Sequence, residues 1–197
     1  MYEIYVFPKQ NISEAGAVVV TDRPDEAQAA LEKGACVCYF NDAKKEDTTI
    51  ESAYCTDFWC YSMFRSISES VKKPLPVGTM GLLIKKEHPA LAEFVTEGYA
   101  TPQWWKLTEG SEASVLDAWK EITPIVQIID NVERNHKIGL IYEARVGAGR
   151  LLVCRRNLMK QRSLETDCLY NSLVHYCASS AFAPSFSFTP QEVAELL

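Results

Sequence analysis

The sequence predicts an α/β fold with three layers: a mostly parallel sheet flanked by helices, with a β-hairpin at one edge. Apolar, β-branched segments alternate along the chain with segments of helical periodicity, which is typical of parallel sheets. The run ACVCYF at 35–40 is continuously apolar, as expected for a strand covered on both faces. No internal repeat or linker divides the 197 residues, so we expect one domain over 1–197.

Turn and cap residues divide the first half of the chain into elements. Pro24 suits the first turn of a helix over 23–34, and Gly34 suits its end. The segment 57–70 has helical spacing of aromatic residues, and 41–52 is polar enough to be a loop. Strands are expected at 3–7, 17–21 and 35–40.

The second half of the chain contains the clearest signals. A short helix is expected at 88–94 and another at 114–122, with Ser114 as the N-cap residue. The segment 163–182 has an apolar stripe at helical spacing, and the tail can add one last turn. Strands are expected at 79–84 and 125–130.

The segment KIGLIYEARVGAGRLLVCR predicts a hairpin that reverses at Gly147 to Gly149. Alternate residues of its first strand should share one face and point into the core. These residues are Ile138, Leu140, Tyr142, Ala144 and Val146. On this interpretation the segment 124–155 is scaffold: an interior strand, a polar turn and an edge hairpin.

Composition excludes several classes of protein. The net charge of -6 gives no broad basic field for nucleic acid or anionic lipid. No apolar run approaches the roughly 20 residues that a membrane helix needs, and the first ten residues do not resemble a signal peptide. The seven cysteines are an odd number, and most lie in apolar strand or helix patterns, so we expect mainly buried, reduced thiols.

Several kinds of active site are also excluded by the absence of their motifs. The loop PKQNISEAG lacks the residues of a phosphate-binding loop, and no dinucleotide or P-loop motif occurs, so we expect no cofactor. There is no G-x-S-x-G elbow, and Cys36 and Cys38 lie inside a strand instead of at a nucleophile elbow. Cysteine and histidine spacings do not suit a metal site. A Cys–His pair that uses His88, His136 or His175 stays open.

Two groups of residues are candidates for contact with a ligand or a partner. The first is polar and lies at and after a strand end, where α/β sheets carry sites; it consists of Asp130, Asn131, Arg134, His136 and Glu143. Capping and salt bridging are the favoured explanation of these side chains, with ligand contact as the alternative. The second is aromatic, Trp59, Trp104 and Trp105, which can stack on sugars or fill the core. We assign no catalytic residue.

Four segments, taken in order, resemble a known family. They are FWCYSMF, GTMGLLIKKEHPALAEFVTEGYATPQWWKL, PIVQIIDNVERNHKIGLIYEARVGAGRLLVCR and SLVHYCASSAF. Together they resemble the C-terminal accessory region of bacterial family 2 glycoside hydrolases, of the β-galactosidase and β-mannosidase type found in gut Bacteroidetes. The similarity covers about residues 2–182. The chain departs from the family pattern at Val95, where proline is expected.

The resemblance implies a flavodoxin-like fold of the class I glutamine amidotransferase type. It also implies a non-catalytic domain that packs on the catalytic part of a polysaccharide-degrading enzyme or on another subunit, in a periplasmic or secreted parent. The catalytic glutamates of that family belong to a TIM barrel, which no stretch here can form, so none is carried over. Two alternatives stay open: a carbohydrate-binding module, and a small enzyme of the amidotransferase-like fold.

Overall fold

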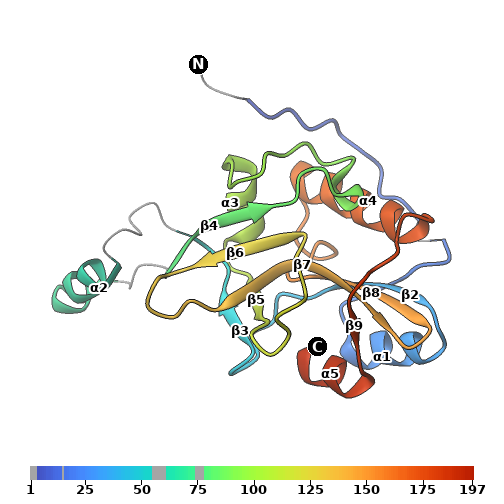
Figure 1. Cartoon of the computed structure of the whole chain (residues 1–197). Helices are drawn as coiled ribbons and strands as arrows, with labels where there is room; N and C mark the ends of the chain where they lie inside the picture. The colour runs from blue at the N-terminus through green and yellow to red at the C-terminus, as the bar shows by residue number, and fades with distance from the viewer. Residues whose placement is uncertain (1–3, 15, 55–60, 74–77) are drawn as a thin grey trace.

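The computed structural model describes residues 4–14, 16–54, 61–73 and 78–197, which form one mixed sheet with helices around it (Figure 1). The strands are β1 Val19–Thr21, β2 Cys36–Phe40, β3 Thr49–Glu51, β4 Thr79–Ile84, β5 Glu112–Val115, β6 Val126–Asp130, β7 Lys137–Val146, β8 Gly149–Cys154 and β9 Ser187–Phe188. The helices are α1 Pro24–Glu32, α2 Tyr61–Ser70, α3 Pro102–Thr108, α4 Leu164–Ala178, α5 Pro190–Leu196 and the short 3-10 helix η2 Pro89–Leu91.

The prediction of a mostly parallel, flavodoxin-like or amidotransferase-like sheet is wrong. Among the described strands, the pairs β1–β2, β2–β8 and β7–β9 are parallel, whereas β3–β5, β4–β6, β5–β7, β6–β7 and β7–β8 are antiparallel. The helix α1 does connect two neighbouring parallel strands, as expected. Beyond β2, however, consecutive strands are not linked by crossover helices on alternate faces, so the parallel pattern does not continue.

The long strand β7 lies at the centre of the sheet, which corrects the prediction of an edge hairpin. Ile141 pairs with Cys154 of β8 and with Val126 of β6, so these two strands flank β7. The strand β5 lies on the β8 side, because Ile138 pairs with both β5 and β6. On the β6 side, β9 pairs with β7 only at Arg145 and Val146. A gap therefore separates the end of the β6 pairing from the start of the β9 pairing.

A β-bulge in β7 changes which side chains face which side. Gln127 pairs with Gly139, but the next residue, Val126, pairs with Ile141, so Leu140 is the extra residue. The five hairpin residues predicted to be buried are all buried, but they do not share one face. Ile138 and Leu140 belong to one core cluster, and Tyr142, Ala144 and Val146 belong to the other. The predicted alternation fails here because the extra residue moves every later side chain of β7 to the opposite face.

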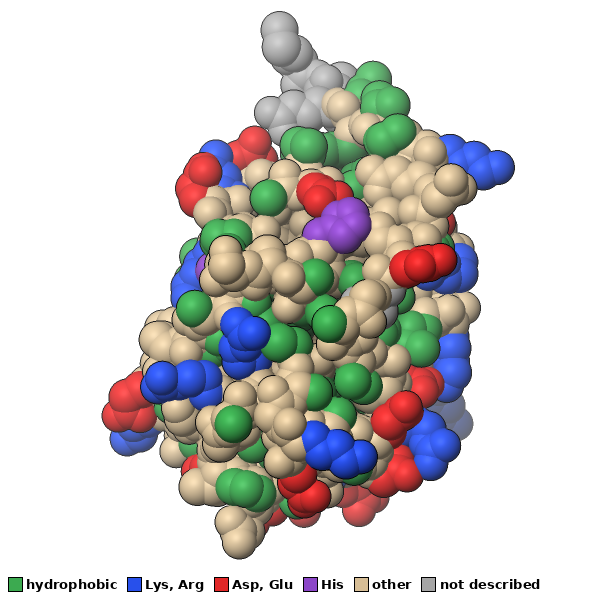
Figure 2. Space-filling model, turned by 90° about the vertical axis from the view of Figure 1, so that its right-hand side faces the viewer, with side chains coloured by type: hydrophobic (Ala, Val, Ile, Leu, Met, Phe, Trp, Pro, Cys, Tyr) green, Lys and Arg blue, Asp and Glu red, His purple; other side chains and the backbone are tan. Residues whose placement is uncertain are grey.

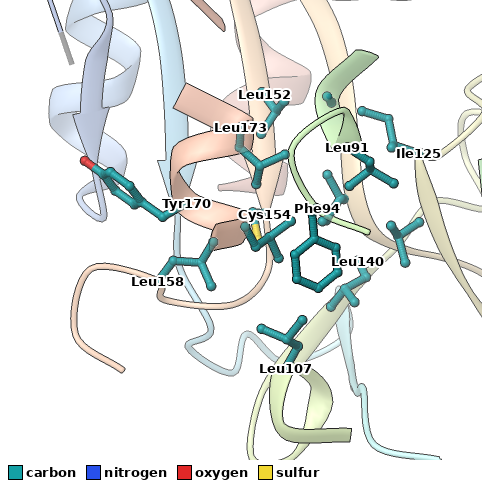
Figure 3. Packing of buried hydrophobic residues seen from close by; sticks show 14 of the residues in the cluster. Leu91, Phe94, Leu107, Ile125, Leu140, Leu152, Cys154, Leu158, Tyr170 and Leu173 are labelled. Atoms are coloured by element: carbon teal, nitrogen blue, oxygen red, sulfur yellow. The ribbon is translucent and has the colours of Figure 1, made fainter. Parts of the chain in front are cut away.

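Two hydrophobic clusters occupy opposite faces of the sheet. The first contains buried residues of α3, α4 and η2 packed against β4, β6 and β8; Figure 3 shows Leu173 of α4, Cys154 of β8 and Phe94 within it. The rings of Phe40 and Tyr170 meet here at 5.3 Å. The second cluster lies under α1 and α5, which cover the half of the sheet made by β1, β2, β8 and β9.

Local predictions succeed at many elements and fail at four. The segment 4–7 forms no strand; Phe7 instead stacks on Phe94 at 5.6 Å. The segment predicted as a helix at 114–122 begins in β5, and the predicted loop 41–52 contains β3. The helix α3 was not predicted, although the Thr101–Pro102 pair is a typical start. Residues 57–60 of the helix predicted at 57–70 lie outside the described residues.

Candidate functional site

The polar turn that follows β6 is built by two side chains that hold backbone amides. Asp130 is buried and accepts hydrogen bonds from the amides of Asn131 at 2.8 Å and His136 at 2.9 Å. Asn131 accepts from the amides of Glu133 and Arg134 and donates to the carbonyl of Gly78 at 2.8 Å. This is the capping role that short polar side chains have in turns.

The side chains of Arg134 and His136 also have partners within the chain. The guanidinium of Arg134 contacts the Asp130 carboxylate at 2.6 Å, and the ring of His136 contacts Asp117 at 2.6 Å. Burial alone would raise the pKa of Asp117, but hydrogen bonds from His136 and from the Lys137 amide lower it. These contacts leave the turn with little hydrogen-bonding capacity for a ligand.

The tryptophans differ in their surroundings. Trp104 is fully buried; its indole N–H donates to Oγ1 of Thr96 at 2.8 Å, so it is a core residue. Trp105 is 43 % exposed and meets the ring of Tyr54 edge-on at 5.4 Å. Trp59 lies outside the described residues. Of the described tryptophans that were candidates, only Trp105 presents its ring to solvent.

Glu143 is separate from the turn and lies in a cluster of ionisable groups. Its Oε2 accepts a hydrogen bond from the hydroxyl of Tyr176 in α4 at 2.8 Å. Its Oε1 lies 3.9 Å from Nε2 of His88, whose ring meets that of Tyr176 edge-on at 5.4 Å. Lys85 is close enough for its charge to act on both Glu143 and His88. We call these four residues the Glu143 cluster.

The gap in the sheet creates room beside this cluster. The carbonyl of Ile141 accepts from the amide of Ile125, and the amide of Arg145 donates to the carbonyl of Phe186, both at 2.8 Å. Backbone groups of alternate residues point to the same side of a strand. The N–H and C=O of Glu143 therefore point into the gap between these two contacts, away from β8.

Burial controls the ionisation of the cluster. Burial raises the pKa of Glu143, although the Tyr176 hydrogen bond and the Lys85 charge oppose this shift. Burial and the hydrogen bond to Glu143 also raise the pKa of Tyr176. Burial and then the Lys85 charge lower the pKa of His88. Burial also lowers the pKa of Lys85. Because His88 is neutral at neutral pH, its contact with Glu143 is not an ion pair there.

A small pocket opens at the cluster, with a volume of about 90 Å³. It is lined by Lys85, His88, Ile122, Thr123, Ile125, Glu143, Ser185 and Phe186. A carboxyl group, an imidazole and an amine around one hollow can bind a polar ligand or exchange protons with it. Of these groups, Glu143 was a candidate for ligand contact from the sequence, and His88 was considered only as half of a Cys–His pair. The others come from distant segments with no common motif, so no sequence signal joins them.

Most of this chain matches one family model. Residues 18–197 match a domain of unknown function, DUF8487. The chain belongs to this family. No curated protein matches the sequence.

Three further observations concern possible metal groups, helix length and surface charge. Nowhere in 4–14, 16–54, 61–73 and 78–197 do three His, Cys, Asp or Glu side chains form a group that could hold a metal ion. Among those residues there is also no helix long and apolar enough to cross a membrane. Figure 2 shows acidic and basic side chains interspersed over one face of the molecule.

Proposed function

We propose that this DUF8487 domain is a non-catalytic accessory domain of a polysaccharide-degrading glycoside hydrolase, and that it packs on the catalytic part or on another subunit. Four segments that resemble the accessory region of family 2 enzymes support this, because they occur in the same order and extend over most of the chain. The flavodoxin-like fold that the resemblance implies is not the fold of this chain. Support from the structure must therefore come from its surfaces.

The observation that carries the proposal is an apolar face on β4 and β6 that the described part of the chain leaves exposed. Leu83 is 57 % exposed and pairs with Tyr99, which is 59 % exposed, so both side chains lie on one face of the sheet. Ile129 is 38 % exposed and pairs with Gly81, which places it on the same face two residues along. We call Leu83, Tyr99 and Ile129 the β4–β6 face.

The helices α1 and α5 lie on this side of the sheet but cover other strands. α1 lies against β1, β2 and β8, and α5 lies against β9 and α1. In Figure 1 the strands β4 and β6 are at the front of the molecule, with α3 and α4 behind them. Adjacent exposed apolar side chains on a sheet are typical of a surface that another domain or subunit covers. The opposite faces of β4 and β6 are already filled by the first core cluster.

A charge on the β4–β6 face tests this docking. Leu83→Asp should abolish co-purification of the chain with the polypeptide encoded directly upstream of it, supplied as a separate chain. Leu164→Asp is the matched control, because Leu164 is 46 % exposed and belongs to α4, on the other side of the sheet. An acidic residue in the first turn of a helix is well tolerated. If co-purification is lost equally in both variants, or retained equally in both, docking through this face is contradicted.

The non-catalytic part of the proposal has its own test. The isolated chain should not hydrolyse nitrophenyl glycosides, because its candidate carboxylates, Asp130 and Glu143, have partners within the chain. Asp130 accepts from two backbone amides and contacts Arg134, and Glu143 accepts from the hydroxyl of Tyr176. Turnover that disappears on changing Asp130 or Glu143 would show that the domain is an enzyme.

A further inference from the structure

The pocket at the Glu143 cluster presents donors and acceptors that a hydroxyl group fits. Oε2 of Glu143 is occupied by Tyr176, but Oε1 faces Nε2 of His88 across 3.9 Å, which is too long for a hydrogen bond. Nδ1 of His88 accepts a hydrogen bond from the amide of Ala90 at 3.2 Å. In the neutral ring, the proton must then be on Nε2, so Nε2 is a donor that points toward an acceptor it does not reach.

We propose that this pocket binds a pair of hydroxyl groups at the end of a neutral carbohydrate. A hydroxyl oxygen about 2.8 Å from both atoms can donate to Oε1 of Glu143 and accept from Nε2 of His88 at the same time. A second hydroxyl can accept from the amine of Lys85, which spends one donor on the carbonyl of Thr123 at 2.9 Å. The backbone N–H and C=O of Glu143, which point into the gap, add another donor and acceptor.

Other ligand classes fit these groups less well. An ammonium group offers donors only, so it could not accept from His88 and would be repelled by Lys85. A carboxylate or phosphate offers acceptors only and would lie against Glu143. A purely apolar ligand would leave the carboxylate and both nitrogens without partners, which is costly in a half-buried site. A hydroxyl is both donor and acceptor, and it carries no charge.

The size of the pocket sets what part of a sugar can enter. A volume of about 90 Å³ equals roughly three water molecules. That space takes the hydroxyl-bearing edge of a sugar, while the rest of the ring stays outside, next to the half-buried ring of Phe186. The inference uses only this pocket and not the β4–β6 face, so either proposal can fail without the other.

Chemical-shift titration of the isotope-labelled chain measures such binding. Methyl mannoside and methyl galactoside are the probes, and glycerol is the control for any small polyol. We expect saturable shifts at residues that line the pocket, with a dissociation constant on the order of 1–10 mM, because few contacts are made. Glu143→Gln should weaken binding about tenfold or more, because it removes a charged acceptor. Its amide oxygen can still accept from Tyr176, so the variant should fold.

Glu93→Gln is the matched control variant, because Glu93 also contacts a histidine. Its Oε1 lies 2.7 Å from Nδ1 of His175 in α4, and both side chains are exposed. It should bind as the unmodified chain does. His88→Asn is a second test: asparagine can still cap Ala90, but it is too short to reach the ligand. Binding should again weaken.

Four results would overturn the inference. They are no saturable shift with either glycoside, shifts centred away from the pocket, glycerol binding as tightly as the glycosides, and equal affinity in the Glu143→Gln and Glu93→Gln variants. In the first case the pocket holds only water.

Discussion

Replacing Gly139 with alanine tests how the bulge in β7 packs against the second core cluster. A Cβ atom at Gly139 would lie 2.6 Å from Cδ1 of Leu116 and 2.8 Å from Cδ1 of Tyr142. Carbon atoms in ordinary contact are about 3.5–4.0 Å apart. Both neighbours are fully buried, and the hydroxyl of Tyr142 is hydrogen-bonded to Ser114 at 2.9 Å, so neither can turn toward solvent.

The magnitude follows from two opposing effects. Overpacking of a filled core costs about 1–3 kcal/mol. Alanine also restricts the unfolded chain, which returns about 0.4–1 kcal/mol where the backbone conformation suits it. We therefore expect Gly139→Ala to lower the free energy of unfolding by about 1–2 kcal/mol, as measured by urea denaturation. For a domain of this size, the melting temperature should fall by roughly 2–8 °C.

Gly98→Ala is the control, because a Cβ there meets nothing closer than the carbonyl of Ile84 at 3.7 Å. It should be neutral or slightly stabilising. A Gly139→Ala protein that is as stable as Gly98→Ala would show that Leu116 and Tyr142 do not pack against β7 as described.

Three further predictions concern the core and its ionisable groups. Leu140→Ala should cost about 2–5 kcal/mol in urea denaturation, because Leu140 is buried in the first cluster and its loss leaves a cavity; an unchanged midpoint would argue against this placement. Burial lowers the pKa of His88 below the usual histidine value of 6.5. The neutral ring therefore contributes stability at a pH above 6.5, and this contribution is lost as the pH falls through the lowered pKa. Melting curves recorded at falling pH should therefore show a weaker acid dependence for His88→Asn, and parallel curves would count against this. Thiol labelling should be slow at four buried cysteines until the protein unfolds, and rapid labelling of any of them in native protein would be inconsistent with Cys38, Cys154, Cys168 and Cys177 being buried.

The parts of the fold that depend on neighbouring residues in sequence were predicted well. Pro24 does begin α1, and the helix predicted at 163–182 is α4, which Ser163 caps by accepting from the amide of Thr166. The strand at 79–84 has the predicted bounds, and the β7–β8 hairpin turns at Gly147, which has a φ of 59°. Caps, tight turns and short apolar runs carry their own local energies, so a sequence pattern is enough to find them.

The parts that depend on distant partners were not predictable in the same way. Ser114 suits a helix start, yet its hydroxyl bonds Tyr142 and its segment pairs with β7 as β5. The strand β3 is only three residues long and exists through its pairing with β5. Strand direction in the sheet is likewise decided by such pairings, and the bulge at Leu140 reverses an alternation that the sequence shows as continuous.

The candidate site also contains a part that local sequence predicts and a part that depends on distant partners. The sequence named Asp130 and Asn131 as residues for ligand contact or for turn capping, and the structure gives them the capping role. It also named Glu143, as a candidate for ligand contact or for a partly exposed ion pair. The structure instead places Glu143 in a half-buried cluster with Tyr176 and His88, which come from other elements. These groups meet at one pocket beside the gap between β6 and β9, and this gap depends on strand pairing that the sequence does not show.

The most direct test of the central claim is the size of the protein in cells that encode it. An antibody against this domain should detect, in an immunoblot of cell extract, a polypeptide far larger than the 22.2 kDa of the chain, and the same band should hydrolyse glycosides in a zymogram. A single species of about 22 kDa, without glycosidase activity or a co-purifying glycoside hydrolase, would contradict the account.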